Sequence, residues 1–383
     1  MAIVVVALLL SAGPEPVAAL DTLQVETSDP ILDPWNWRAF DSDDTGGWIR
    51  TMYEDQEGAI WFATQSGASR YDGLDWLRYT EADGLIDGSV TRVLQTRDGA
   101  MWFGTKRGVS RLTHGQWTSW APDDGLAGSQ VSSMLQAQNG SIWVVFQAFG
   151  DTTTPGLGIS RYDGDSWHTV ELPPTKAAEP WGLSNIVEGP DGALWVNAFG
   201  SGVLRYDGSA WRLFTPADGL AGANAAQLEV TEDGAVWVSF AEFGGYESNG
   251  LSRFDGTSWT THTPGGSRDW LSMWQTHDGV LWAGGTGSLA SFDGHHWSVY
   301  DLSEPLSTVA PQLAVELVFG LALRDGSLWL ETGRTAARYS PAGPVPIRYQ
   351  HPDRLFGGYE DAAGGVWFHT DHAAVRHQDG QWL

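Results

Sequence analysis

Residues 187–214 read VEGPDGALWVNAFGSGVLRYDGSAWRLF, and the rest of the chain repeats the pattern of this stretch. Asp191-Gly192 and Asp207-Gly208 are two-residue turns of the kind that joins antiparallel strands, because Asp and Gly accept the positive φ values that such turns require. A glycine-rich connection lies between them, at residues 200–202. The turns and the connection separate four short apolar or aromatic runs, which predicts a four-stranded antiparallel meander.

The second predicted strand of this unit carries a tryptophan that recurs along the whole chain. Eight copies are found, at Trp61, Trp102, Trp143, Trp195, Trp237, Trp282, Trp329 and Trp367. Their mean spacing is about 44 residues, which is typical of four-stranded propeller blades and not of helical repeats. The turn before the fourth strand also recurs, except in the copy around residues 339–347. We therefore predict a single all-β propeller domain over residues 35–383, with eight four-stranded blades.

Composition narrows the possible functions. The 383-residue chain contains 48 glycines and 22 tryptophans, which the turns and the packing between blades explain. It has no cysteine, so disulfides, thiolate metal sites and a thiol nucleophile are excluded. The formal net charge of −26 repels nucleic acid and anionic lipid surfaces and favours cationic, neutral or sugar-like partners, although solubility alone would also explain it.

The first residues have the pattern of an export signal. Residues 1–19 contain an apolar core at 3–10, a Gly-Pro break and a run of small residues up to Ala19, although no basic residue precedes the core. The apolar core is too short to span a bilayer. We therefore expect cleavage of this signal peptide before Leu20, a linker over residues 20–34, and a periplasmic or extracellular protein that does not insert into the membrane after cleavage.

The two ends of the repeat array complement each other. Trp35 to Phe40, WNWRAF, match only the fourth strand of the unit, where a tryptophan is followed three residues later by an aromatic residue. The eighth copy supplies strands at 355–360, 366–370 and 374–377 and stops at Trp382-Leu383, where its fourth strand would begin. We expect the N-terminal strand to be the outermost strand of blade eight, because an open ring leaves unpaired edges. A seven-bladed ring with an extra hairpin, irregular near Tyr339, is the alternative.

The two faces of the predicted ring differ in the length of their connections. If the strands of a blade are called A to D from the centre outward, short Asp-Gly hairpins join A to B and C to D on one side, the turn face. The B–C and D–A connections lie on the opposite side, the loop face. Nearly all length variation falls there, in the segments 146–158, 171–184, 240–250, 260–271 and 301–315. Function in a rigid scaffold concentrates in such loops.

Two motifs carry a family resemblance. The pattern Gly-x-x-Trp-[Phe/Val]-x-Thr-x-x-Gly-[Val/Leu]-x-Arg-Tyr-Asp-Gly, clearest at 58–73 and 99–115, resembles the two-component regulator propeller repeat, and Asp-Gly-Leu at 83–85, 124–126 and 218–220 fits the same family. The resemblance implies an extracytoplasmic sensor propeller, often for carbohydrate, with seven or fourteen repeats and a membrane sensor kinase as partner. This sequence departs from the family in showing eight copies and no membrane helix, immunoglobulin-like adaptor or kinase after them.

Aromatic residues gather in the loop-face connections of the third, fourth and fifth copies. Aromatic planes next to polar groups suit a neutral, sugar-like or peptide ligand, because stacking buries area while the polar groups fix orientation. The alternative is that these rings pack beneath the long loops. The residues predicted to bind a ligand are Phe149, Trp181, Phe199, Phe243, Tyr246, Arg268, Asp269 and Trp270.

Other possible chemistry has a simpler explanation. The carboxylates of the Asp-Gly pairs are explained by turn formation. His369, Asp371 and His372 could approach one ion, but no further ligand cluster is visible, so a solvated loop is favoured. We find no catalytic, phosphate-binding or dinucleotide motif, and predict neither metal nor cofactor. The predicted function is a non-enzymatic sensor of a glycan or other neutral small ligand. A protein-interaction scaffold is the alternative, followed by a propeller lyase or hydrolase.

Overall fold

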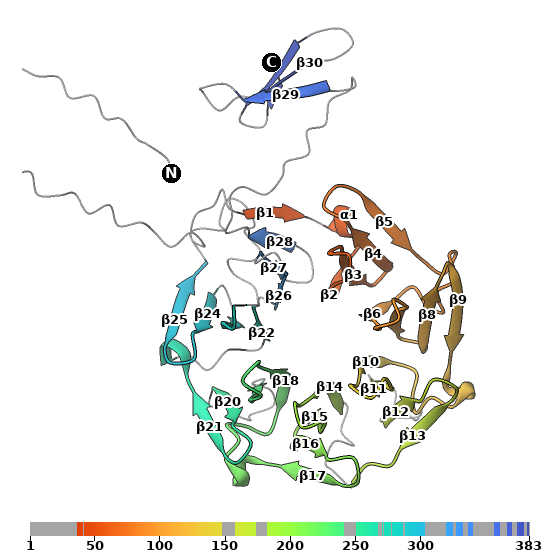
Figure 1. Cartoon of the computed structure of the whole chain (residues 1–383), viewed down its shortest axis with the longest axis vertical. Helices are drawn as coiled ribbons and strands as arrows, with labels where there is room; N and C mark the ends of the chain where they lie inside the picture. The colour runs from red at the N-terminus through yellow and green to blue at the C-terminus, as the bar shows by residue number, and fades with distance from the viewer. Residues whose placement is uncertain are drawn as a thin grey trace, which may run out of the picture.

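Seven four-stranded antiparallel sheets stand around a common centre in this computed structural model (Figure 1). The fold is therefore an all-β propeller of four-stranded blades, as predicted. The structure describes residues 37–40, 42–147, 158–173, 182–240, 250–266, 270, 272–276, 278–285, 288–302, 319–324, 327–331, 336–339, 356–360, 366–369, 374–378 and 381–382.

The blades are numbered in chain order, and each begins with its innermost strand. Blade 1 contains β2 (Ile49–Glu54), β3 (Ile60–Thr64), β4 (Gly67–Tyr71) and β5 (Trp76–Tyr79); blade 2 contains β6 (Val90–Gln95), β7 (Met101–Thr105), β8 (Val109–Thr113) and β9 (Gln116–Trp120); blade 3 contains β10 (Val131–Gln136), β11 (Ile142–Phe146), β12 (Gly158–Tyr162) and β13 (Trp167–Val170). Blade 4 contains β14 (Leu183–Glu188), β15 (Leu194–Ala198), β16 (Gly202–Tyr206) and β17 (Trp211–Phe214); blade 5 contains β18 (Ala225–Val230), β19 (Val236–Phe240), β20 (Leu251–Phe254) and β21 (Trp259–His262); blade 6 contains β22 (Ser272–Gln275), β23 (Leu281–Gly285), β24 (Ser288–Phe292) and β25 (Trp297–Asp301).

Blade 7 combines the two ends of the ring. It contains β26 (Phe319–Ala322), β27 (Leu328–Glu331), β28 (Ala336–Tyr339) and, as its outermost strand, β1 (Trp37–Phe40). β1 runs antiparallel to β28, with Arg38 opposite Arg338 and Phe40 opposite Ala336. The short helix α1 (Ser42–Thr45) then leads into blade 1. The N-terminal strand thus closes the ring, as predicted, but on a different blade.

The ring has seven blades, so the prediction of eight was wrong and its alternative holds. The eighth copy forms a separate sheet outside the ring, with β29 (Phe356–Glu360), β30 (Val366–His369), β31 (Ala374–Gln378) and β32 (Gln381–Trp382) (Figure 1). Its fourth strand is its own, because β32 pairs with β31. The seventh copy is the one that needs a partner, since the C–D turn is missing from its sequence and β1 takes the place of its fourth strand.

The tryptophan of strand B lies at the centre of the packing between blades. Trp61 is 3% exposed and Trp102 is 2% exposed. The aromatic residue at the end of strand D stacks on this tryptophan: the ring centroids of Trp61 and Tyr79 are 5.3 Å apart, and those of Trp102 and Trp120 are 5.4 Å apart. Such ring contacts contribute about 1 kcal/mol beyond the area they bury. Each tryptophan also contacts the next blade: the centroids of Trp61 and Phe103 are 5.5 Å apart, and those of Trp102 and Trp167 are 6.3 Å apart. The repeated tryptophans therefore hold neighbouring blades together.

The Asp-Gly-Leu motif of the D–A connection joins one blade to the next. Asp83 Oδ2 accepts hydrogen bonds from the backbone N of Thr80 at 2.8 Å and from its Oγ1 at 2.9 Å. Gly84 has a φ of +125°, and a Cβ added there would lie 2.5 Å from Cγ of Trp117 in blade 2. Leu85 is 4% exposed and belongs to the core between blades 1 and 2. Each residue of the motif thus has a structural role.

The two faces of the ring differ as the sequence predicts. The A–B turns have one length throughout, from residues 55–59 in blade 1 to 323–327 in blade 7. The D–A connections vary, from residues 80–89 after blade 1 to 302–318 after blade 6. Among the described residues, none of the helices has the length and apolar character needed to cross a membrane.

Candidate functional site

Most of the ligand site predicted on the loop face lies outside the described residues, which exclude Phe149, Trp181, Phe243, Tyr246, Arg268 and Asp269. Phe199 follows β15, is partly buried, and donates a backbone hydrogen bond to Gly182 O at 2.9 Å. Trp270 is 2% exposed in the core between blades 5 and 6, and its Nε1 donates to Pro264 O at 3.3 Å. Trp270 thus has the packing role considered as the alternative, and the loop-face ligand site stays a prediction.

The carboxylates of the C–D turns stabilise the turns themselves. Asp207 Oδ1 accepts hydrogen bonds from the backbone N of Ala210 and of Ser209, each at 2.9 Å. These hydrogen bonds lower the pKa of Asp207 to about 2. The turn interpretation is confirmed. No group of three or more potential metal ligands occurs among the described residues, which exclude Asp371 and His372.

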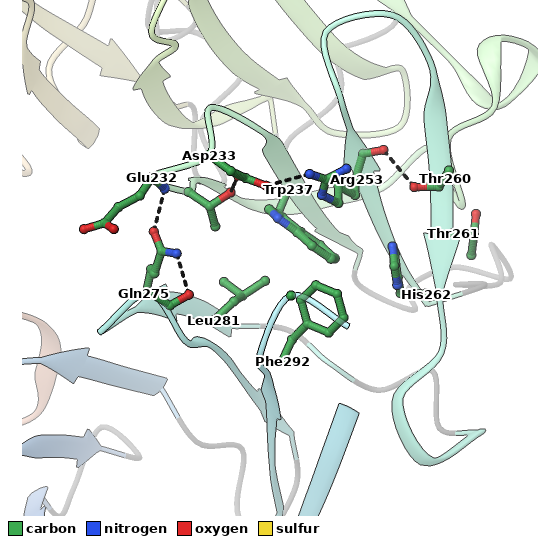
Figure 2. Close-up of a pocket in the computed structure, with 13 residues that line it drawn as sticks. Glu232, Asp233, Trp237, Arg253, Thr260, Thr261, His262, Gln275, Leu281 and Phe292 are labelled. Carbon is green, nitrogen blue, oxygen red and sulfur yellow. Dashed lines mark hydrogen bonds and ion pairs between the residues drawn. The ribbon is translucent and has the colours of Figure 1, made fainter. Parts of the chain in front are cut away.

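A groove of about 540 Å³ lies at the turn face between blades 5 and 6 (Figure 2). Blade 5 supplies its A–B turn, the tryptophan of strand B, an arginine of strand C and three residues of strand D, and blade 6 supplies an apolar wall and two glycines of its turns. The lining residues are Thr231, Glu232, Asp233, Trp237, Arg253, Thr260, Thr261, His262, Gln275, Gly279, Leu281, Phe292 and Gly294.

Part of this groove repeats an arrangement found in other blades. Arg253 donates from a terminal nitrogen to Asp233 Oδ2 at 2.6 Å, and its Cζ lies 5.9 Å from the centroid of the Trp237 ring. Equivalent contacts between arginine, turn carboxylate and strand-B tryptophan occur in blade 2 at Arg111, Asp98 and Trp102, and in blade 4 at Arg205, Asp191 and Trp195. The arginine and carboxylate therefore brace several blades and do not by themselves distinguish this groove.

His262 distinguishes this groove from the equivalent positions in other blades. The same position at the end of strand D is aromatic in blades 1, 2, 4 and 6, where it holds Tyr79, Trp120, Phe214 and Tyr300. The imidazole lies 4.8 Å from the Trp237 ring, and its Nδ1 accepts a hydrogen bond from Trp297 Nε1 at 3.4 Å. Burial, helped by the positive charge of Arg253, lowers the pKa of His262. Since indole N–H can only donate, the proton of the neutral imidazole is assigned to Nε2.

Glu229 of blade 5 is a second residue that departs from the pattern of the repeat. It lies directly opposite Trp237 in the register of β18 and β19, where the corresponding residue is Leu94 in blade 2 and Val187 in blade 4. Burial of the carboxyl raises its pKa to about 8, an effect only partly offset by a hydrogen bond from the backbone of Gln275. The carboxyl is therefore mostly protonated at neutral pH. Sequence analysis missed Glu229 and His262, although both interrupt positions that are otherwise apolar or aromatic.

A second groove, of about 460 Å³, lies between blades 7 and 1. Its lining includes Trp329, Tyr71 and Arg338, together with Glu57 and Arg324. Here the end of strand D is aromatic, because Phe40 stacks on Trp329 with ring centroids 4.9 Å apart. An open wedge between blades is thus a recurring feature, and the groove between blades 5 and 6 differs from it by its histidine.

Comparison with known proteins supports the resemblance seen in the sequence. The two-component regulator propeller family matches residues 43–66 and 84–107. No curated protein matches the chain. The molecule is a β-propeller, and its first two blades carry two-component regulator propeller repeats.

Solved structures of several other propellers share this fold. Streptogramin B lyase is 17% identical, with a TM-score of 0.59 over 79% of this chain and 96% of its own. The extracellular domain of a hybrid two-component system from B. thetaiotaomicron is 15% identical, with a TM-score of 0.61 over 88% of this chain and 47% of its own. PorZ, a surface component of the type-IX secretion system of Porphyromonas gingivalis, is 14% identical, with a TM-score of 0.59 over 84% and 50%. The chain spans about half of the last two, and identities this low show the fold alone.

Proposed function

We propose that this chain is a binding propeller of a bacterial signalling system, which recognises a carbohydrate or other neutral small ligand outside the cytoplasm and has no enzymatic activity. The observation that carries the proposal is the pair of regulator propeller repeats at residues 43–66 and 84–107. The difference between the faces supports it, since uniform turns on one face and variable connections on the other suit a scaffold that presents a binding surface. A membrane sensor kinase is the proposed partner.

The ligand is proposed to bind on the loop face, near Phe199 and Phe243. The test is a screen of the mature chain against a glycan array and a small-molecule panel, repeated with a Phe199→Ala, Phe243→Ala double variant. A Leu74→Ala, Leu77→Ala double variant is the control, because both leucines are exposed in blade 1, at 67% and 52%. Binding should be lost in the phenylalanine variant and kept in the leucine variant.

Three results would count against this proposal. Ligand binding that survives the phenylalanine variant unchanged would move the site elsewhere. Turnover of a bound compound, detected as a new product by mass spectrometry, would favour the lyase or hydrolase interpretation. If the screen finds no small ligand but a protein is captured at micromolar affinity, the scaffold interpretation replaces the sensor.

Export follows from the same proposal and has its own test. Residues 1–19 have an apolar core and small residues before the predicted cleavage point. We expect mass spectrometry of the protein recovered outside the cytoplasm to find an N-terminus near Leu20. Protein that is soluble in the cytoplasm and retains Met1 would contradict it.

A further inference from the structure

The geometry points to a second binding site on the loop face, at the junction of blades 1 and 2, which takes a small carboxylate with a flat apolar part. The site consists of Arg50, Arg92, Lys106 and Arg107, here called the basic cluster, together with the exposed Trp48. It lies on other blades than the ligand site of the proposed function and does not depend on that ligand.

The members of the basic cluster lie at one end of two neighbouring innermost strands. β2 and β6 are adjacent around the centre of the ring (Figure 1). The register of β2 with β3 shifts at Arg50, and the register of β6 with β7 shifts just before Arg92, so both arginines lie where strand A begins at the loop face. The backbone N of Lys106 donates to Ser89 O at 3.3 Å, which places the B–C connection of blade 2 beside the start of β6.

The exposed members of the cluster have no ionic partner in the described part of the chain. Arg50, Lys106 and Arg107 are exposed, and none of their side chains forms a hydrogen bond or an ion pair with a described residue. By contrast, arginine–carboxylate pairs brace blades 1, 2, 4 and 5 at the turn face. The chain has 47 acidic residues and only 21 basic ones, so neighbouring cations without a carboxylate partner stand out.

The carboxylates nearest to the cluster in the chain bind the backbone instead. Asp87 Oδ1 accepts a hydrogen bond from Ser89 N at 2.8 Å, and Glu81 Oε1 accepts one from Gly88 N at 2.9 Å. These hydrogen bonds hold the D–A connection between blades 1 and 2 in place. Neither carboxylate forms an ion pair with a residue that the structure describes, so the charges of the cluster stay available to a ligand.

Arg92 gives a further reason for an anion to bind here. One of its terminal nitrogens donates to Thr91 O at 2.7 Å, which holds the guanidinium near the loop-face end of β6. Burial, helped by the positive charge of Arg50, lowers the pKa of Arg92 to about 10, and the negative charge of Glu331 offsets this only in part. The two guanidiniums therefore repel each other, and a carboxylate bound beside them reduces that repulsion.

The charge of the molecule and the exposed tryptophan define the class of ligand. A guanidinium binds a carboxylate through two parallel hydrogen bonds. The net charge of −26 repels a multiply charged anion more strongly than a single carboxylate, which disfavours nucleic acid and phosphate esters. Trp48 is 43% exposed and lies two residues before Arg50, so its ring offers an apolar surface next to the cations. An aromatic carboxylate matches both features.

The test uses the mature chain and saturation-transfer NMR with benzoate, benzamide and phenyl phosphate, followed by calorimetry. Benzoate should bind and benzamide, its neutral counterpart, should not. Raising the salt concentration should weaken benzoate binding, because salt screens exposed charges.

Four variants locate the site. Arg50→Gln should weaken benzoate binding about tenfold, Lys106→Gln about threefold, and Trp48→Ser about three- to tenfold. Arg212→Gln is the control, because it removes one positive charge from an arginine that is 67% exposed on blade 4. Melting temperatures of all four variants check that they are folded.

Each outcome bears on the proposal. Weaker benzoate binding in Arg50→Gln and Lys106→Gln, with Arg212→Gln unchanged, supports the basic cluster. Equal losses in Arg212→Gln would show that general charge attracts the anion and would overturn the location. If benzoate does not bind the wild-type chain, or if benzamide or phenyl phosphate binds more tightly, the ligand class is wrong. Benzoate binding that is lost in the Phe199→Ala, Phe243→Ala variant and kept in Arg50→Gln would assign the anion to the site of the proposed function and overturn the cluster.

Discussion

Glu229 is the residue at which the repeat departs furthest from its own pattern. It lies eight residues before the strand-B tryptophan, where the other ring blades carry Tyr53, Leu94, Leu135, Val187, Trp274 and Leu321. An unpaired carboxylate is costly inside a protein, so the group keeps its proton instead. That proton makes the stability of the ring depend on pH.

We predict that Glu229 lowers the stability of the ring as the pH rises from about 4.5 to about 8. The reference pKa is 4.5 and the folded value is about 8, so in this window the unfolded chain has released a proton that the folded chain retains. The free energy of unfolding should fall by up to about 1.4 kcal/mol per pH unit from this group. Urea titrations of the wild type and Glu229→Gln between pH 5 and 8.5 measure the effect. Equal slopes in the two proteins would contradict it.

Gly84 allows a prediction that separates backbone strain from steric conflict. Gly84→Ala places a Cβ 2.5 Å from Trp117 at a φ of +125°, whereas Gly73→Ala meets nothing within 4 Å at a φ of +101°. Both variants have the left-handed strain of about 1 kcal/mol, and the first adds overpacking of about 1–3 kcal/mol. Thermal and urea unfolding should therefore rank Gly84→Ala well below Gly73→Ala. Equal losses would mean that Trp117 moves aside without cost.

At the residue scale, the roles of residues that recur in every copy can be predicted from the sequence. The consequences of a residue that differs in one blade are harder to predict. The Asp-Gly carboxylates could be assigned to turns because their spacing alone implies it, and Asp207 bears this out. His262 could have been recognised, since the Trp-x-x-aromatic pattern of strand D reads Trp259-x-x-His262 in the fifth copy. The groove beside it could not, because its volume depends on how two blades pack.

At the scale of elements, β1 is the strand on which the ring depends. Its Phe40 is 3% exposed and stacks on Trp329. The sequence predicted the type of strand correctly from the WNWRAF pattern but assigned it to the wrong blade. The WNWRAF pattern identifies β1 as a fourth strand. Which blade it joins depends on which blade lacks a fourth strand of its own. The seventh copy had lost its second turn, and that loss was the relevant signal.

We predict that removing β1 destabilises the whole ring. Deleting residues 35–40 exposes the edge of β28 and interrupts the contacts between blades 7 and 1. Phe40→Ala alone should lower the free energy of unfolding by about 3–5 kcal/mol. Shortening the B–C connection of blade 3, within residues 148–157, should change it little. Thermal melts in the reverse order would show that β1 is dispensable.

At the scale of the whole molecule, the number of repeats is not the number of blades. Eight copies give a ring of seven, because the eighth forms its own sheet with four strands. Sequence periodicity fixes the kind of unit and the approximate size of the ring. The number of blades in the closed ring depends on how the blades pack around the centre. The sequences of neighbouring copies do not show this packing. The loop-face ligand site stays a prediction for another reason, because most of its residues lie outside the described part of the chain.

We predict that a chain ending at residue 355 keeps the ring intact. No strand of β29–β32 pairs with a strand of the ring. The melting temperature of the truncated chain should stay within about 2 °C of the full chain, because the blade-to-blade contacts are unchanged. Circular dichroism melts of both chains provide the measurement. A fall of several degrees, or loss of cooperative unfolding, would show that the C-terminal sheet supports the ring.

The pairing of β1 with β28 also bears on how the molecule associates during refolding. β1 is a short strand at the start of the ring sequence and its partner β28 is at the end, so any β28 edge with the same sequence will accept it. At high protein concentration the partner can belong to another molecule, which gives a strand-exchanged dimer whose blades are identical to those of the monomer. Dilute refolding favours the monomer, because the strand's own ring is then its nearest acceptor.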